Sequence, residues 1–132
     1  LYFAYFLWFK NYTFSIPSFD TMLKTFGKGL LLIVVVSLPE EVFFRAFMQE
    51  TVLSRYKNKL FFIISKKNFI TSAIFGLTHA IAFMDISRAT TFFPSLLFGW
   101  IVEKSEGRII YSILFHSFAN ILSFSLWNFV SG

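Results

Sequence analysis

The chain has 132 residues, of which 56% are hydrophobic, 22% are aromatic and only 14% carry a charge. A soluble domain of this length cannot bury so many apolar side chains, 21 of them Phe, so the composition favours a protein that crosses a membrane several times. The net charge of +5 comes from basic residues at the ends of apolar runs, which argues against a nucleic-acid partner, and the absence of Cys excludes disulfides, thiolate metal ligands and a Cys nucleophile.

Residues 1–29 differ in composition from the long apolar runs that follow. Residues 1–9 are apolar with no basic region before them, which is typical of the end of a truncated helix and not of a signal peptide. Residues 11–29 contain Pro17, Gly27 and Gly29 among scattered polar residues, and they predict a loop or interfacial segment. We therefore expect the main domain to cover residues 30–132.

Four apolar segments in that domain predict an all-α fold, a polytopic bundle of transmembrane helices with about four spans. The first helix should run from about residue 30 to 55, because its leading apolar run of ten residues is too short for a hydrocarbon core of about 30 Å. The later spans are expected at 68–84, 90–102 and 108–130, with a turn at 85–89 and a loop at 103–108.

The basic residues predict the topology. Five lie in 55–67, around the short apolar run 60–65, while the loop at 85–89 has only Arg88 and the loop at 103–108 has Lys104 and Arg108. Cytoplasmic loops carry the excess of Lys and Arg, so we expect 55–67 and 103–108 on the cytoplasmic side, with 55–67 lying at the interface.

Several polar side chains fall where these spans should be embedded in lipid. A charged residue at a helix centre costs at least about 2.5–3.5 kcal/mol, so such residues usually face protein or water and mark function. The spacing also pairs some of them on one helix face, four residues apart. The deep polar residues are Glu40, Glu41, Arg45, His79, His116 and Asn120, and the pairs are Glu41 with Arg45, Phe75 with His79, and His116 with Asn120.

The spacing separates the two acids. Arg45 can neutralise Glu41, whereas Glu40 points about 100° away and stays free for chemistry. Counted from the nearest cytoplasmic basic residues, Glu40, His79 and His116 lie within one to two helical turns of the same depth, so one shared site is feasible.

Each of these residues also has a purely structural explanation. Ser37 and Glu40 around Pro39 fit a capping box at a helix start. A lone intramembrane His is often only hydrogen-bonded to a backbone carbonyl, and Asn120 alone could hold two helices together. What favours function is the combination, because two His, an acid pair and one Arg are the ingredients for activating water.

Three short motifs carry a resemblance to a known family. EEVFFR (40–45) fits EExxxR, FGLTH (75–79) fits FxxxH and HSFAN (116–120) fits HxxxN, in the order found in the CAAX-protease and bacteriocin-processing (CPBP) family of intramembrane endopeptidases, the Abi family, which is related to Rce1-type prenyl-protein peptidases. The likeness covers roughly residues 30–128. Ala46 departs from the pattern, since this family usually has Gly after the Arg.

The resemblance implies proteolysis inside the membrane, of CAAX-type proteins or of bacteriocin or signalling peptides. Glu40 and His79 would activate a water, His116 and Asn120 would stabilise the oxyanion, and Glu41, Arg45 and Phe75 would support them. We favour a site without a cofactor; zinc held by Glu40, His79 and His116 is the alternative.

These inferences predict an integral membrane enzyme, with a membrane-associated peptide or protein substrate and the lipid bilayer as partners. The bias towards Phe, Lys and Ile points to a bacterial plasma membrane. The competing hypothesis is a non-catalytic immunity or transport protein that uses the same buried polar cluster.

Overall fold

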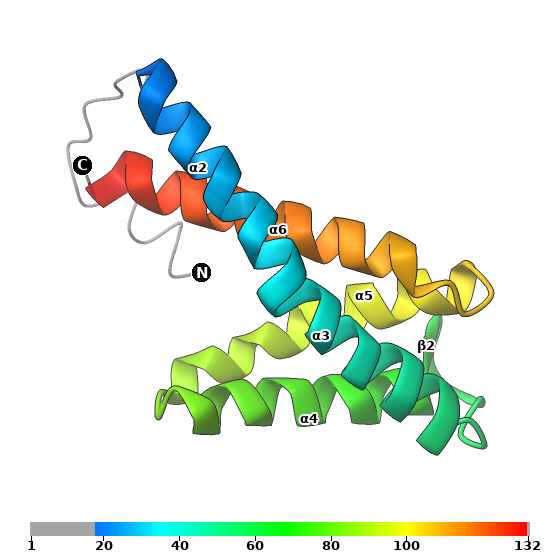
Figure 1. Ribbon diagram of the computed structural model, residues 1–132. Helices are drawn as coiled ribbons and strands as arrows, with labels where there is room; N and C mark the ends of the chain where they lie inside the picture. Colours follow the sequence, from blue (N-terminus) through cyan, green and yellow to red (C-terminus); the bar gives the residue numbers. More distant parts are fainter. Residues whose placement is uncertain (1–17, 132) are drawn as a thin grey trace.

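The computed structural model describes residues 18–131, without the side chains of residues 22, 25 and 124–131. The predicted end of a truncated helix at 1–9 lies outside the described residues. The described part of the chain is mostly helical, as predicted, and also contains one short two-stranded sheet (Figure 1).

A long helical rod forms the first part of the structure (Figure 1). It consists of α2 (Phe19–Leu32), the π-helical η1 (Ile33–Ser37), α3 (Leu38–Glu41) and the π-helical η2 (Val42–Val52). Pro39 has no N–H and its ring crowds the preceding turn, and a widened π turn accommodates both effects. Accordingly, the Leu38 N–H donates to the carbonyl of Ile33, five residues back.

The structure contradicts two interpretations of this part of the sequence: the capping box, which was the structural alternative for Glu40, and the loop within the loop or interfacial segment. Ser37 is helical (φ −63°, ψ −43°) and makes no capping hydrogen bond, so no capping box starts a helix at Glu40. Residues 19–29 are helical instead of a loop, because Ser18 accepts a hydrogen bond from the Thr21 N–H (3.3 Å) and caps α2. Gly29 permits close packing, since a Cβ there would lie 2.9 Å from Ile121 Cγ1 on α6.

The second half of the chain contains three more α-helices, and each begins and ends within two residues of its predicted bounds. A hairpin of β1 (Lys59–Phe61) and β2 (Ile64–Ser65) leads into α4 (Lys66–Ala82). The 3₁₀ segment η3 (Ile86–Thr91) then connects α4 to α5 (Phe92–Lys104), which is followed by α6 (Ile109–Ser131).

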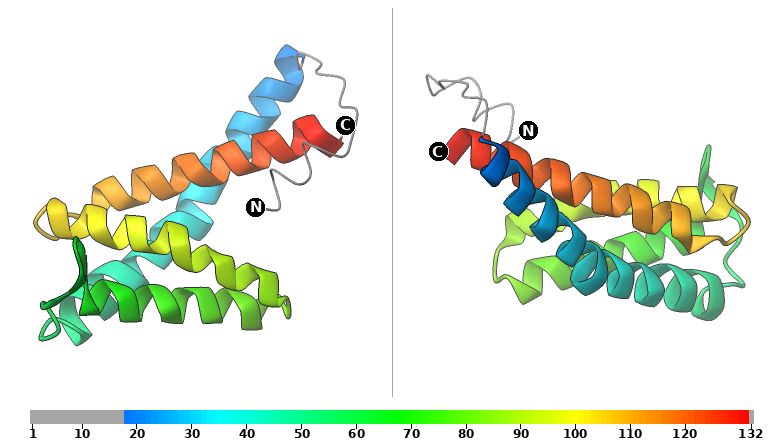
Figure 2. Two further views of the ribbon diagram at one scale, coloured as in Figure 1. Left: turned by 180° about the vertical axis from the view of Figure 1, so that it is seen from behind. Right: turned by 45° about the horizontal axis from the view of Figure 1, so that its top comes forward.

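The helices pack so that every later helix borders the rod. α4 packs against α5 and η2, while α6 packs against α2, η1 and α5. Figure 2 shows α4, α5 and α6 running roughly alongside one another, with the rod crossing them at an angle. The acids on α3 therefore lie where α6 and α4 both approach the rod.

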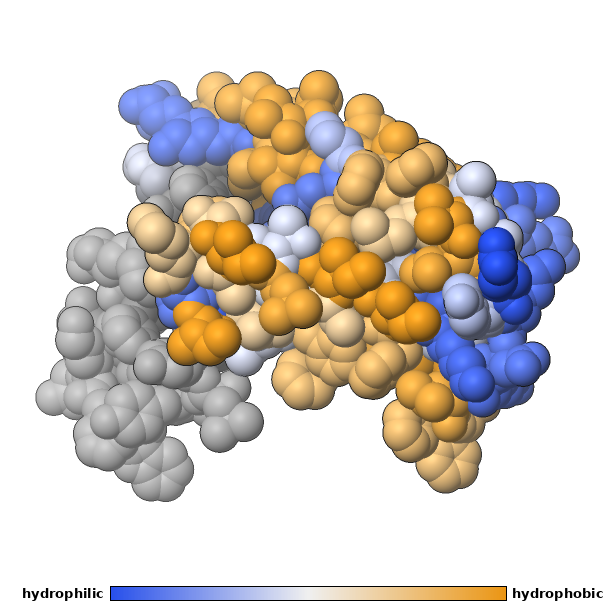
Figure 3. Space-filling view, turned by 90° about the horizontal axis from the view of Figure 1, so that it is seen from below, coloured by the Kyte–Doolittle hydropathy of each residue, from blue (hydrophilic) through white to orange (hydrophobic). Residues whose placement is uncertain are grey.

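The interior of this bundle contains many polar side chains, and much of its exterior is apolar. Figure 3 shows one face on which apolar residues cover most of the described surface and hydrophilic residues gather at the ends. The apolar side chains buried among the described residues include Phe44, Phe75, Phe98, Val102 and Ile113. The buried polar ones include Ser37, Glu41, Arg45, Gln49, Asn68, Thr71, Ser72, Ser95, Ser112, His116 and Ser117.

In the part of the chain that the structure describes, none of the helices combines the length with the apolar character needed for a membrane span. The expectation of about four spans is thus not met helix by helix. α4 has 17 residues and α5 has 13, against the roughly 20 that cross a bilayer core, and the rod is divided by its π-helical turns.

Candidate active site

Glu41 is the centre of a buried polar cluster between α3 and α6. Its side chain is fully buried, and so is that of Arg45, whose Nε lies 3.4 Å from Glu41 Oε2. This contact confirms the pairing predicted from the four-residue spacing. Two residues of α6 complete the cluster: the Ser112 hydroxyl donates to Oε2, and His116 Nδ1 lies 2.9 Å from Oε1.

Glu40 faces a different set of partners, although it is the next residue. Its Oε1 lies 3.7 Å from His79 Nε2 on α4, and its Oε2 lies 3.6 Å from His116 Nε2 on α6. The side chain is 25% exposed, and Oε2 is buried with no hydrogen-bond partner among the described residues. Both distances exceed that of a direct hydrogen bond, and one water beside each pair could bond to both of its atoms.

The other ring nitrogen of each imidazole fixes the ring. His79 Nδ1 lies 3.0 Å from the Phe75 carbonyl, so Nδ1–H donates there and Nε2 points to Glu40. The Phe75 ring lies against His79, with centroids 4.3 Å apart, as the spacing predicted. Glu41 accepts from His116 Nδ1–H, and Phe98 stacks on the His116 ring with centroids 4.6 Å apart.

Asn120 is not in direct contact with these groups. Its Nδ2 donates to Ser37 Oγ at 3.3 Å. Asn120 lies one turn after His116 on α6, and Ser37 lies one turn before Glu40 on the rod. Asn120 pairs with Ser37 while His116 and Ser112 pair with Glu41, so the two helices run antiparallel along one polar seam. The structure thus brings Glu40, His79 and His116 together. It places Asn120 one turn away, where it joins α6 to the rod.

Three residues of this network were missing from the sequence prediction. Ser112 forms a stripe with His116 and Asn120 at four-residue spacing, and Gln49 continues the stripe of Glu41 and Arg45, so periodicity could have identified both. Ser95 on α5 had no such signal.

Arg45 is held from two sides. One terminal nitrogen donates to the carbonyl and hydroxyl oxygens of Ser95, at 2.9 and 2.6 Å, and the other donates to Gln49 Oε1 at 3.1 Å. Gln49 in turn donates to the carbonyl of Gly99 at 3.0 Å. The α5 backbone therefore fixes the guanidinium that faces Glu41.

Two imidazole Nε2 atoms and a carboxylate are the right donor types for zinc, and each imidazole has the second hydrogen bond that such ligands usually have. Within the described residues, however, no group of three or more His, Asp or Glu side chains is arranged to hold a metal ion. The chemistry proposed below uses only the side chains of the chain, and zinc remains the alternative that the experiments below test.

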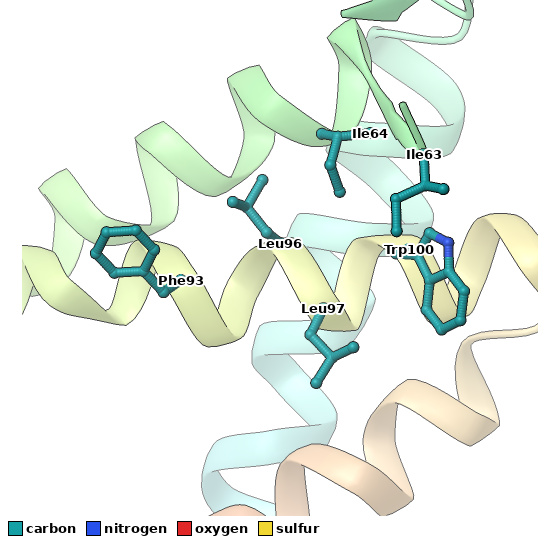
Figure 4. Close-up of a pocket in the computed structure, with 6 residues that line it drawn as sticks. All are labelled: Ile63, Ile64, Phe93, Leu96, Leu97 and Trp100. Atoms are coloured by element: carbon teal, nitrogen blue, oxygen red, sulfur yellow. The ribbon is translucent and has the colours of Figure 1, made fainter. Parts of the chain in front are cut away.

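A separate hollow of about 380 Å³ lies on the outer side of α5, lined only by apolar residues (Figure 4). It is bordered by the hairpin on one side and contains none of the acids or imidazoles described above. The lining residues are Ile63, Ile64, Phe93, Leu96, Leu97 and Trp100.

A family model of proteases matches most of the chain, residues 23–122, and this span includes all three motifs. The chain belongs to the type II CAAX prenyl endopeptidase Rce1-like family. The match confirms the resemblance stated from the motifs, and the family is one of membrane-associated, CAAX-type proteases. No curated protein and no solved structure matches the chain.

Proposed function

We propose that the chain is an intramembrane endopeptidase in which Glu40 and His79 activate a water for attack on a peptide bond. The observation that carries the proposal is the convergence of His79 Nε2 and His116 Nε2 on the two carboxylate oxygens of Glu40. A carboxylate set between two fixed imidazoles, in a protein with a buried polar interior, has the components of a general acid–base site.

In the proposed reaction one water is hydrogen-bonded to both Glu40 and His79. Glu40 takes a proton from the water while the water oxygen bonds to the substrate carbonyl carbon. His79 Nε2 accepts a hydrogen bond from the other hydrogen of the water and so orients it. When the tetrahedral intermediate collapses, the carbon–nitrogen bond breaks and Glu40 returns the proton to the leaving amine. No electrons are exchanged and no co-reactant other than water is needed.

His116 is proposed to stabilise the oxyanion. Because Nδ1 faces Glu41, Nε2 lies on the side of Glu40, and an N–H at Nε2 would donate to the oxygen that becomes negative. Asn120 supplies the second donor by exchanging its long bond to Ser37 for the oxyanion.

The bundle's polarity supports a membrane location for this chemistry. Fully buried polar side chains between helices and large exposed apolar ones outside are the arrangement expected where lipid surrounds the protein. We propose that the rod with α4, α5 and α6 forms an integral membrane bundle and that the site opens to membrane-associated peptides. The family favours a substrate cleaved near a prenylated C-terminus over bacteriocin or signalling peptides.

A Glu40→Gln variant of the reconstituted chain tests the proposal. We expect cleavage of a prenylated CAAX peptide to fall at least about 100-fold, because Gln cannot accept the proton. Glu106→Gln, the same change in an exposed loop, should cleave at the wild-type rate. Persistent cleavage by folded Glu40→Gln would contradict the catalytic role, and no cleavage by the wild type of either prenylated or unprenylated peptides would favour the immunity or transport hypothesis.

Metal analysis with chelator treatment tests the choice of mechanism. We expect cleavage to survive chelation and zinc to be well below one equivalent per chain. Stoichiometric zinc, with activity lost on chelation and restored by zinc, would replace the proposed mechanism with zinc held by Glu40, His79 and His116.

A further inference from the structure

The hairpin β1–β2 projects from the bundle with apolar side chains at its tip. Lys59 pairs with Ser65 and Phe61 with Ile64, and Phe62 makes the turn in the left-handed region with φ 29°. Phe62 is 95% exposed, Phe61 61% and Ile63 53%. Figures 1 and 2 show the hairpin at one end of the bundle, beside the end of α5.

The base of the hairpin is held in place. The Lys66 N–H donates to the Asn58 carbonyl at 2.9 Å and the Lys67 N–H to the Tyr56 carbonyl at 3.0 Å. The hydroxyl of Ser65 donates to Glu103 on α5. The same hydroxyl accepts from the Asn68 N–H and so caps the first turn of α4. These hydrogen bonds fix the orientation of the hairpin relative to α4 and α5. The exposure of Phe61 and Phe62 at its tip therefore follows from the fold.

The hairpin and the residues that flank it carry more positive than negative charge. The segment 51–84 contains no Asp or Glu. Lys67 is neutralised by Glu50, whose two oxygens both lie 2.7 Å from its Nζ. The remaining basic side chains are exposed, and none of them forms an ion pair with a described residue: Arg55, Lys57, Lys59 and Lys66.

We propose that this hairpin docks onto an anionic phospholipid surface, with Phe61 and Phe62 entering the boundary between headgroups and acyl chains and the four cations binding lipid phosphates. Aromatic and aliphatic side chains enter such an interface to a depth of about 5–10 Å, and juxtamembrane cations are attracted to anionic lipids. The apolar hollow of Figure 4 lies next to the hairpin and extends from Ile63 and Ile64 along α5. The surface beside the hairpin tip is therefore also apolar, as contact with lipid requires.

The charge pattern favours lipid over a protein partner. A second copy of this chain also carries +5, so two hairpins with the same four cations would repel each other. A lipid surface offers repeated negative groups that need no matching geometry. The proposal concerns an attachment surface and uses none of the residues of the proposed active site.

The absence of Cys allows a direct test with single spin labels on the full chain, reconstituted in vesicles. Phe62→Cys carries the label, and Glu106→Cys, an exposed residue also at positive φ in the loop between α5 and α6, is the control. In vesicles of phosphatidylcholine with phosphatidylglycerol, we expect the label at 62 to be accessible to oxygen and shielded from a water-soluble nickel complex. The label at 106 should remain accessible to nickel.

A second arm tests the selectivity for anionic lipid. In the Phe62→Cys background, Lys57→Gln with Lys59→Gln should reduce the ratio of lipid-embedded to aqueous label about fivefold for each charge removed. The matched control, Lys24→Gln with Arg88→Gln, removes two exposed charges elsewhere and should leave the ratio unchanged. Pure phosphatidylcholine attracts none of the four cations, so it should lower the ratio further than the double hairpin variant does.

Three results would overturn the proposal. A label at 62 that stays aqueous on anionic vesicles would show that the tip does not enter the membrane. Equal insertion into neutral and anionic vesicles would contradict recognition of anionic lipid. A label shielded from both oxygen and nickel would show that a protein surface, of this chain or a second copy, covers the tip.

Discussion

At the residue scale, two adjacent carboxylates have different surroundings. The side chain of Glu41 is fully buried and is contacted by Ser112, His116 and Arg45, whereas Glu40 is 25% exposed and makes no hydrogen bond at Oε2 among the described residues. A buried charge is stable only when its partners surround it, so Glu41 suits a positioning role. Glu40 has the freedom to exchange a proton.

Ser112→Ala tests how much the seam between α3 and α6 depends on the bonds to Glu41. Losing the donor leaves one carboxylate oxygen short of a hydrogen bond in a buried site, which we expect to lower the free energy of unfolding by about 1–3 kcal/mol. Unfolding of the purified chain in detergent measures this. Ser123→Ala, at an exposed position on the same helix, should be nearly neutral, and equal stabilities of the two variants would contradict the assignment.

At the scale of elements, α5 approaches the rod and α4 through small residues. Ser95 and Gly99 lie one turn apart and face Arg45 and Gln49, to which they offer backbone carbonyls. Small residues at a helix interface let backbones come close, as in many membrane bundles. The position of Arg45, and through it of Glu41, therefore depends on a helix that carries none of the three motifs.

Gly99→Ala should disturb this approach. The added Cβ would lie 2.0 Å from Asn68 Oδ1 and 2.6 Å from Gln49 Oε1, so α5 must move or both amides must leave their positions. We expect a loss of about 1–3 kcal/mol in the free energy of unfolding. Gly27→Ala meets no atom within 4 Å and should be neutral or stabilising by up to about 1 kcal/mol; a neutral Gly99→Ala would contradict the close contact.

Glu103, at the end of α5, predicts a pH effect on stability. Burial raises the pKa of its carboxyl above the ordinary value, against the opposing effect of the Ser65 hydrogen bond. The folded state then keeps this proton to a higher pH than the unfolded state, so the contribution is fully present below the ordinary pKa and is lost as the pH rises through the raised one.

The check is thermal unfolding of Glu103→Gln and the wild type from acidic to neutral pH. The variant cannot ionise at this position, so we expect the wild type to lose stability relative to Glu103→Gln as the pH rises. Glu106→Gln, in the exposed loop, should give a curve parallel to that of the wild type. A parallel curve for Glu103→Gln would exclude the pKa effect.

At the scale of the whole molecule, the proposed membrane bundle predicts a topology. Basic residues gather at the end with the hairpin and the loop at 103–108, while the turn after α4 has Arg88. In a chain without Cys, single Cys residues at 57, 88 and 106 can be labelled from outside intact cells. We expect 57 and 106 to be protected and 88 to react, and labelling of all three from one side would contradict the bundle's orientation.

The sequence by itself determined what depends on contacts within one helix and on composition. The period of 3.6 residues fixes which side chains share a face, so the contacts of Glu41 with Arg45 and of Phe75 with His79 were predictable, as were the bounds of α4, α5 and α6. The order of the three motifs was enough to indicate the family.

Only the tertiary structure decided what depends on register between helices. It set His116 between both acids, joined Asn120 to Ser37, and brought Ser95 under Arg45, because the axial offset of one helix against another follows from packing over their whole length. It also replaced the expected loop at 19–29 and the capping box at Glu40 by one continuous rod, because Ser18 caps the helix and π turns absorb Pro39.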